Sequence, residues 1–103
     1  MKIWNVVVTP EFYKEVQTIH SYVKNNLFEP IIANKLVNKI LEKIDSLKTL
    51  PYRFPLLEIE TINNSKYRKL IVDNYIVIYE IKEEDNVVLI LHVFYSSMNY
   101  LNS

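Results

Sequence analysis

The spacing of apolar residues changes once along this chain, and the change limits the folds that the chain can adopt. Between residues 12 and 47, apolar side chains recur every three or four positions, which is the period of a helix with one buried face. Residues 67–95 instead contain three short runs of branched and aromatic side chains, which are typical of β-strands, and residues 2–8 form a similar run. The sequence therefore predicts an α+β domain with the order strand, helix, helix, strand, strand, strand.

Prolines and a capping residue set the bounds of the two predicted helices. Thr9 can accept a hydrogen bond from the first helical turn, Pro10 suits the first helical position, and the first stripe ends near Asn26. Pro30 begins the second helix, and the second stripe ends before Pro51. The two stripes consist of Phe12, Val16, Ile19, Val23 and Leu27, and of Ile32, Leu36, Ile40, Ile44 and Leu47. Because the connection is short, the helices form a hairpin.

Short polar turns separate the last three predicted strands, which we expect to form an antiparallel meander. We expect an irregular connection over residues 52–65. The three strands then cover residues 67–72, 75–81 and 87–95. Glycine is absent, so the turn at Asp73-Asn74 depends on residues that tolerate a positive φ angle. The hairpin packs on one face of the sheet, and the first strand joins an edge. A chain of 103 residues has the size of one domain, residues 1–103.

The predicted strands carry apolar residues on both faces, although one helical hairpin can cover only one of them. An antiparallel sheet with one solvent face normally alternates apolar and polar side chains. With strict alternation, the face away from the helices is lined by Ile76, Ile78, Val88, Ile90 and Phe94. We expect this apolar face to bind a partner molecule, unless residues 52–65 fold over it.

Several residue types that would carry common chemistry are absent. There is no cysteine, which excludes disulfides, thiolate metal sites and a cysteine nucleophile, and two histidines are too few to suggest a metal cluster. Without glycine there is no phosphate-cradling loop, so we expect neither a metal nor another cofactor. Apolar runs are too short for a signal peptide or for the ~18 residues of a membrane span. We therefore expect a cytoplasmic protein without membrane contact.

Charge is balanced over the chain but not along it. The net charge is zero, whereas a nucleic-acid-binding protein normally has a basic excess, because contacts to phosphate dominate its affinity. Residues 1–50 carry 7 basic and 5 acidic groups, and residues 51–103 carry 5 basic and 7 acidic groups. The meander therefore belongs to the acidic half of the chain, which disfavours RNA binding on the sheet.

Several local motifs occur in an order and at a spacing that resemble one known family. They are Val8-Thr9-Pro10-Glu11, Ile19 with Tyr22-Val23, Leu47 with Leu50-Pro51, Tyr67-Arg68-Lys69-Leu70, Asp73-Asn74-Tyr75, Ile78-Tyr79, Val93-Phe94-Tyr95 and Asn99-Tyr100-Leu101. Together they resemble the RelE/ParE toxins, also described as plasmid stabilisation proteins, over nearly the whole chain. The resemblance implies the fold predicted above and the role of toxin in a bacterial type II toxin–antitoxin system. A cognate antitoxin would then bind the apolar face of the sheet.

The chain departs from the family pattern where RNA chemistry would be expected. Members that cut messenger RNA on the ribosome usually carry an arginine just after the tyrosine of the middle strand, and this chain has Ile76 there. They often carry basic residues past the last strand, and this chain has Ser96 and Ser97. Members without these residues resemble ParE, which implies growth inhibition by binding an essential target such as DNA gyrase.

Two alternatives to a target-binding toxin remain open from the sequence. The first is a ribosome-dependent mRNA endoribonuclease, in which Arg68 would stabilise charge and His92 and Tyr95 would transfer protons. Strict alternation places His92 and Tyr95 on opposite faces, and Arg68 could equally pair with an acidic neighbour or with the antitoxin. The second alternative is an inactive interaction domain that forms a homodimer through the exposed sheet face.

Overall fold

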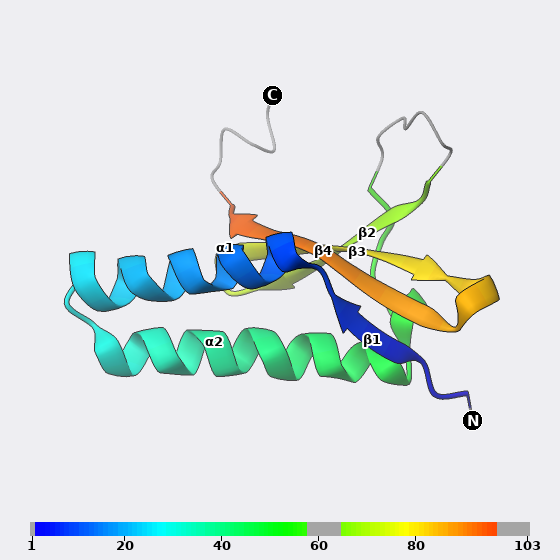
Figure 1. Cartoon of the computed structure of the whole chain (residues 1–103), viewed down its shortest axis with the longest axis horizontal. Helices are drawn as coiled ribbons and strands as arrows, with labels where there is room; N and C mark the ends of the chain where they lie inside the picture. Colours follow the sequence, from blue (N-terminus) through cyan, green and yellow to red (C-terminus); the bar gives the residue numbers. More distant parts are fainter. Residues whose placement is uncertain (1, 58–64, 97–103) are drawn as a thin grey trace.

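A four-stranded mixed sheet with a helical hairpin against one face makes up the computed structural model, which describes residues 2–57 and 65–96 (Figure 1). The strand order is β1-β4-β3-β2. The strands are β1 (Asn5–Val8), β2 (Tyr67–Val72), β3 (Tyr75–Lys82) and β4 (Val87–Tyr95). The helices are α1 (Pro10–Ser21), which continues as the π-helical turn η1 (Tyr22–Asn26), and α2 (Pro30–Asp45). Short 3-10 turns are η2 (Ser46–Lys48), η3 (Pro51–Arg53) and η4 (Glu83–Asp85).

The predicted α+β class and the predicted order of strands and helices are confirmed. Strand β1 is an edge strand that pairs in parallel with β4, while β2, β3 and β4 form the expected antiparallel meander. The first strand is shorter than predicted, since residues 2–4 lie outside it. The turn at Asp73-Asn74 joins β2 to β3, and Asp73 has the positive φ angle of 53° that such a turn requires.

Thr9 connects the end of β1 to the start of α1 and both to β4. Its Oγ1 accepts a hydrogen bond from the Phe12 N–H at 3.1 Å, which is the expected helix cap, and its hydroxyl donates to the Leu91 carbonyl at 3.0 Å. The backbone N–H of Thr9 donates to the Ile90 carbonyl at 3.0 Å. The helix therefore begins where the strand stops, and its first turn is fixed to the neighbouring strand.

A β-bulge interrupts the pairing of β3 with β4. Ile78 pairs with His92 and Tyr79 pairs with Ile90, so Leu91 has no partner of its own on β3. The extra residue reverses the alternation of side chains along β4. Val88 and Ile90, on one side of Leu91, and Val93, on the other, therefore all face the helices in the hydrophobic core.

The prediction that Val88 and Ile90 line the face away from the helices is wrong. Both side chains have 0% of their surface exposed and lie in the core beneath the helical hairpin. The prediction assumed unbroken alternation along the last strand, and the bulge at Leu91 removes that assumption. Among the strand residues assigned to that face, Phe94 has the predicted orientation, because it pairs with Ile76.

The sheet face away from the helices, called the outer face below, is less open than predicted. Ile76 and Ile78 lie on it but are only 2% and 8% exposed in the isolated chain, so the expectation that they form an open patch is wrong. Their cross-strand neighbours are Ile71 and Lys69 on β2, and Phe94 and His92 on β4. These two isoleucines at the middle of the outer face are therefore buried without a partner chain.

Residues 55–57, which follow η3, pair with the edge of β2 and do not fold over the outer face. The Leu57 N–H donates to the Tyr67 carbonyl at 2.7 Å, and the Lys69 N–H donates to the Pro55 carbonyl at 3.1 Å. This pairing satisfies part of an edge that would otherwise expose backbone groups. The remainder of the predicted irregular connection, residues 58–64, lies outside the described residues.

The position of Thr9 yields a test of how the first helix is attached. Thr9→Ala should lower the free energy of unfolding by about 1–2 kcal/mol, because it removes the helix cap and leaves the Leu91 carbonyl without its donor. Thr18→Ala is the control, since the Thr18 hydroxyl bonds only the Lys14 carbonyl on an exposed helix surface. Urea denaturation of the three proteins measures both changes, and equal effects at the two positions would contradict this role for Thr9.

Candidate functional site

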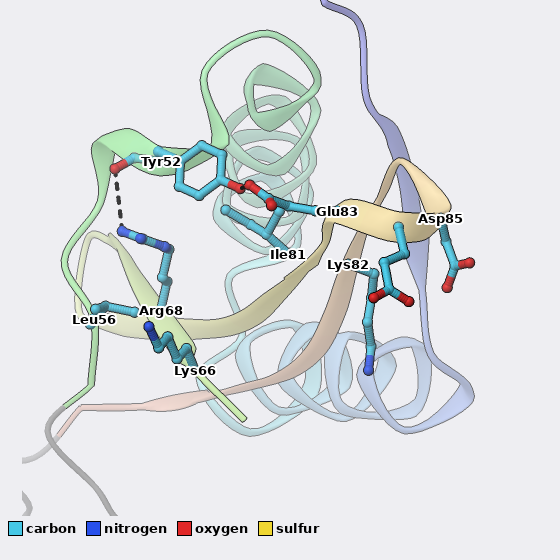
Figure 2. A pocket seen from close by; sticks show the side chains of 9 residues that line it. Tyr52, Leu56, Lys66, Arg68, Ile81, Lys82, Glu83 and Asp85 are labelled. Atoms are coloured by element: carbon cyan, nitrogen blue, oxygen red, sulfur yellow. Dashed lines mark hydrogen bonds between the residues drawn. The ribbon is translucent and has the colours of Figure 1, made fainter. Parts of the chain in front are cut away.

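An open pocket of about 800 Å³ lies at the end of the sheet where β2 begins and β3 ends (Figure 2). Lys66 and Arg68 stand on its β2 side, and the acidic turn η4 stands on the other. Tyr52 lies between them, with its ring near Arg68 and its hydroxyl directed to Glu83 (Figure 2). The pocket therefore has one basic wall and one acidic wall.

Arg68 holds the η3 segment against the end of the sheet. Its guanidinium donates to the Phe54 carbonyl at 2.6 Å and to the Tyr52 carbonyl at 3.3 Å, and it lies 5.1 Å from the centre of the Tyr52 ring. Among the described residues, its hydrogen bonds thus go to backbone carbonyls and not to an acidic side chain. The planar guanidinium of Arg68 thus holds the η3 segment in place, which is a structural role.

Tyr79 supports the same segment from inside the core. It is completely buried, and its hydroxyl donates to the Pro51 carbonyl at 2.6 Å. Burial raises the pKa of Tyr79 to about 12, and the nearby charges of Arg68 and Arg53 offset only part of that rise. The phenol is therefore neutral at physiological pH and acts as a buried hydrogen-bond donor.

Tyr52 is also a weak acid in this setting. Burial raises the pKa of Tyr52 from 10.0, and the hydrogen bond and negative charge of Glu83 raise it further, while Arg68 opposes them. Its hydroxyl donates to the Glu83 carboxylate. A phenol held in this way keeps its proton at neutral pH, so it does not serve as a general base.

His92 lies on the outer face, away from the pocket. Its Nδ1 is 3.2 Å from both carboxylate oxygens of Glu15, and the same carboxylate accepts the Val93 N–H at 3.1 Å. Glu15 of α1 thus caps the β4 edge beyond the end of β1. The sequence analysis missed this contact, because nothing in the helical spacing shows that α1 runs along that edge.

The outer face also brings together a pair that the sequence analysis did not combine. Lys69 and His92 are the two cross-strand neighbours of Ile78, one on each side of it. Since adjacent strands lie about 4.8 Å apart, their backbones are separated by roughly 10 Å. The signal was available from the sequence, because Lys69 directly follows Arg68 and alternation along a strand places the two side chains on opposite faces.

Tyr95 is on the helix side of the sheet at the opposite end from Arg68. It pairs with Tyr75, and the two rings meet edge to face with centres 5.5 Å apart. Arg68 pairs with Tyr79, four residues further along β3, which corresponds to about 13 Å. His92 and Tyr95 lie on opposite faces, as strict alternation over these residues predicts, so the three candidate catalytic residues do not converge.

Metal binding and membrane insertion find no structural support in the described ranges 2–57 and 65–96. No three or more His, Asp or Glu side chains within them are grouped so that they could hold a metal ion. None of the helices in these ranges combines the length and apolar character that crossing a bilayer requires.

The buried phenol of Tyr79 predicts a loss of stability in alkali. Because its pKa is raised in the folded state, its contribution is complete below pH 10 and is lost as pH rises from 10 toward about 12. Tyr79→Phe should be about 1 kcal/mol less stable at pH 7, since the Pro51 carbonyl loses its donor. Between pH 9 and pH 12 the wild type should lose roughly 2 kcal/mol relative to the variant.

Denaturation curves of both proteins across this pH range measure that difference. Other tyrosines and the lysines titrate in both proteins, so subtraction removes their contribution. If the two stability profiles stay parallel up to pH 12, Tyr79 is not held neutral by burial.

The comparisons with known proteins agree with this arrangement. The family model described as "ParE toxin of type II toxin-antitoxin system, parDE" matches residues 6–100. A search of curated protein sequences finds no match.

Solved structures of toxin–antitoxin systems have the same fold. The chromosomal ParDE system from P. aeruginosa matches with a TM-score of 0.74 and 16% identity, covering 92% of this chain and 98% of that one. The RelBE2 complex from Mycobacterium tuberculosis matches with a TM-score of 0.64 and 18% identity, covering 92% and 93%. The RelE–RelB complex from Pyrococcus horikoshii matches with a TM-score of 0.62 and 19% identity, covering 93% and 98%.

The two kinds of comparison carry different weight. At identities below 20%, the structural matches establish the fold, which is that of the RelE/ParE toxins. The family model spans nearly the whole chain and establishes the family. The protein therefore belongs to the ParE toxin family and is the toxin component of a type II toxin–antitoxin system.

Proposed function

We propose that this toxin inhibits growth by binding an essential protein, with DNA gyrase as the candidate target, and that its antitoxin neutralises it. The observation that carries the proposal is the separation of Arg68, His92 and Tyr95. RNA cleavage needs a base, an acid and a cation around one phosphate group. These three side chains instead occupy two faces and two ends of the sheet.

The state of Arg68 also favours binding over cleavage. Its guanidinium already donates to two backbone carbonyls and stacks near Tyr52, so its strongest interactions are within the protein. The pocket beside it faces the acidic turn Glu83–Asp85, which would repel a phosphate backbone. An RNA substrate would have to displace contacts that hold the η3 segment in place.

A second function is favoured by one observation, the placement of Lys69 and His92 on the outer face. A lysine and a partly exposed histidine on either side of Ile78 could supply a cation and a proton-transfer group to one RNA phosphate. This makes ribosome-dependent RNA cleavage the alternative, with a different set of residues from the one suggested by the sequence. A member without toxicity that acts only by protein interaction is the remaining alternative.

The antitoxin contact is proposed for the outer face through Phe94. Of the five residues assigned to that contact from the sequence, Phe94 is partly exposed, while Ile76 and Ile78 are buried on the same face. Val88 and Ile90 lie in the core and cannot touch a partner directly. Ile71, which is in the same cross-strand row as Phe94, is 58% exposed and extends the apolar surface.

Expression of the toxin without antitoxin tests the proposal. Growth should stop, and it should still stop in Lys69→Ala and His92→Gln variants, because binding a protein target does not need their chemistry. Purified toxin should inhibit supercoiling by DNA gyrase, and messenger RNA profiles should stay unchanged on induction. Thermal melting of each variant controls for folding.

Two other results would decide against target binding. If His92→Gln or Lys69→Ala reduces ribosome-dependent RNA cleavage by about 100-fold or more, the protein is a ribonuclease that uses these groups. If the wild-type toxin does not affect growth at all, the chain acts only through protein interaction.

A further inference from the structure

Five large apolar side chains are exposed at the end of the helical hairpin where α1 and α2 are joined (Figure 1). Each has at least half of its surface exposed, and together they form what we call the hairpin-tip patch. Its members are Tyr22, Leu27, Phe28, Ile31 and Ile32. An apolar patch of this extent on a small protein commonly marks an interaction surface.

Phe28, the most exposed member of the patch, has a backbone conformation that is unfavourable for folding. The Glu29 N–H donates to the Val23 carbonyl at 3.1 Å, closing the end of the first helix, and this closure places Phe28 at φ 55°. Glycine or asparagine normally occupies such a left-handed position, and another side chain costs roughly 1 kcal/mol or more there. The Phe28 side chain is also 83% exposed, so it recovers little by burial.

A pocket of about 380 Å³ adjoins the hairpin-tip patch, because two members of the patch, Leu27 and Ile32, line it. Its apolar lining consists of Val23, Leu27, Ile32, Leu36, Tyr75 and Tyr95, and its polar lining consists of Lys35, Lys39, Asp73 and Asn74. A cavity of about 150 Å³ is enough to hold a benzene molecule, so this pocket is large enough for a phenylalanine ring. The hairpin-tip patch thus presents a projecting side chain next to a pocket that could receive one.

We propose that the hairpin-tip patch is a two-fold contact between two copies of this chain, in which Phe28 of each copy occupies the pocket of the other. A two-fold axis requires one surface that complements itself. A projection and a pocket side by side on the same patch meet this requirement, since one rotation fills both pockets. A contact of this kind closes as a dimer.

Charge around the patch supports the same occupant. Glu29 follows the projecting Phe28, and Lys35 lines the pocket. Neither side chain forms an ion pair within the described part of the chain, whereas Lys39 and Asp73, which also line the pocket, pair with each other at 3.2 Å. Entry of Phe28 into the partner's pocket therefore brings the Glu29 carboxylate of one copy toward the Lys35 ammonium group of the other. The two-fold axis makes this contact twice in each dimer.

The size of the patch sets the expected strength of the dimer. With roughly 200 Å² for an aromatic side chain, the five residues present on the order of 500 Å² of apolar surface per copy. A two-fold contact would bury on the order of 1,000 Å² in total, close to the lower limit of specific interfaces. We therefore expect a dimer that dissociates on dilution.

Sedimentation of the free toxin over a range of concentrations tests the contact. The mass should rise from the monomer value of 12.3 kDa toward twice that value. Phe28→Asn should weaken association at least tenfold while leaving the melting temperature unchanged or higher, because asparagine tolerates the left-handed backbone. Tyr13→Asn removes another exposed aromatic from α1 outside the patch and should leave association unchanged.

A charge exchange tests the arrangement within the contact. Glu29→Lys and Lys35→Glu should each weaken the dimer, and the double variant should restore it, because the opposite charges then meet again. Failure of the double variant to recover, with all variants folded by thermal melting, would overturn the proposed seating of Phe28.

The oligomeric state of the wild-type toxin decides whether the self-contact forms. A mass that stays monomeric at every concentration overturns the proposal. If Phe28→Asn then loses affinity for the antitoxin, the patch belongs to the antitoxin. Concentration-dependent dimers that Phe28→Asn abolishes and Tyr13→Asn retains would support the self-contact.

Discussion

The bulge at Leu91 determines which side chains form the core and which face outward. It places Val88, Ile90 and Val93 together under the hairpin, although they would otherwise lie on different faces. The Leu91 carbonyl accepts a hydrogen bond from the Thr9 hydroxyl, which also caps α1. One threonine therefore stabilises the irregular strand and begins the helix that covers it, so the core and the hairpin depend on the same few hydrogen bonds.

Some free backbone groups on each side of the sheet are satisfied by parts of the chain that sequence patterns do not reveal. Glu15 of α1 accepts the Val93 N–H where β1 has ended, and residues 55–57 pair with the start of β2. Covered edges discourage uncontrolled pairing with other chains. Association of this protein through side chains agrees with the exposed apolar groups at the hairpin tip.

The sequence predicted the fold well because the evidence for it is local. Apolar spacing, Pro10, Pro30 and the Asp73-Asn74 turn each act within a few residues, and the structure follows them. The candidate site was predicted less well because it depends on contacts between distant segments. The bulge, the Arg68 contacts to the η3 segment and the pairing of Glu15 with His92 join positions far apart in the chain, and no periodicity encodes them.

The same fold can support RNA cleavage or protein binding, so the function must be argued from side chains. In this chain the best-placed cation, Arg68, holds a loop, while the outer face carries Lys69 and His92 around a buried isoleucine. Ile76 and Ile78 are buried on that face, whereas the hairpin-tip patch carries five exposed apolar side chains. A left-handed, solvent-exposed phenylalanine there is hard to explain by folding, because a polar residue would satisfy the backbone better. Selection for contact with another molecule explains both the left-handed conformation of Phe28 and its exposure to solvent.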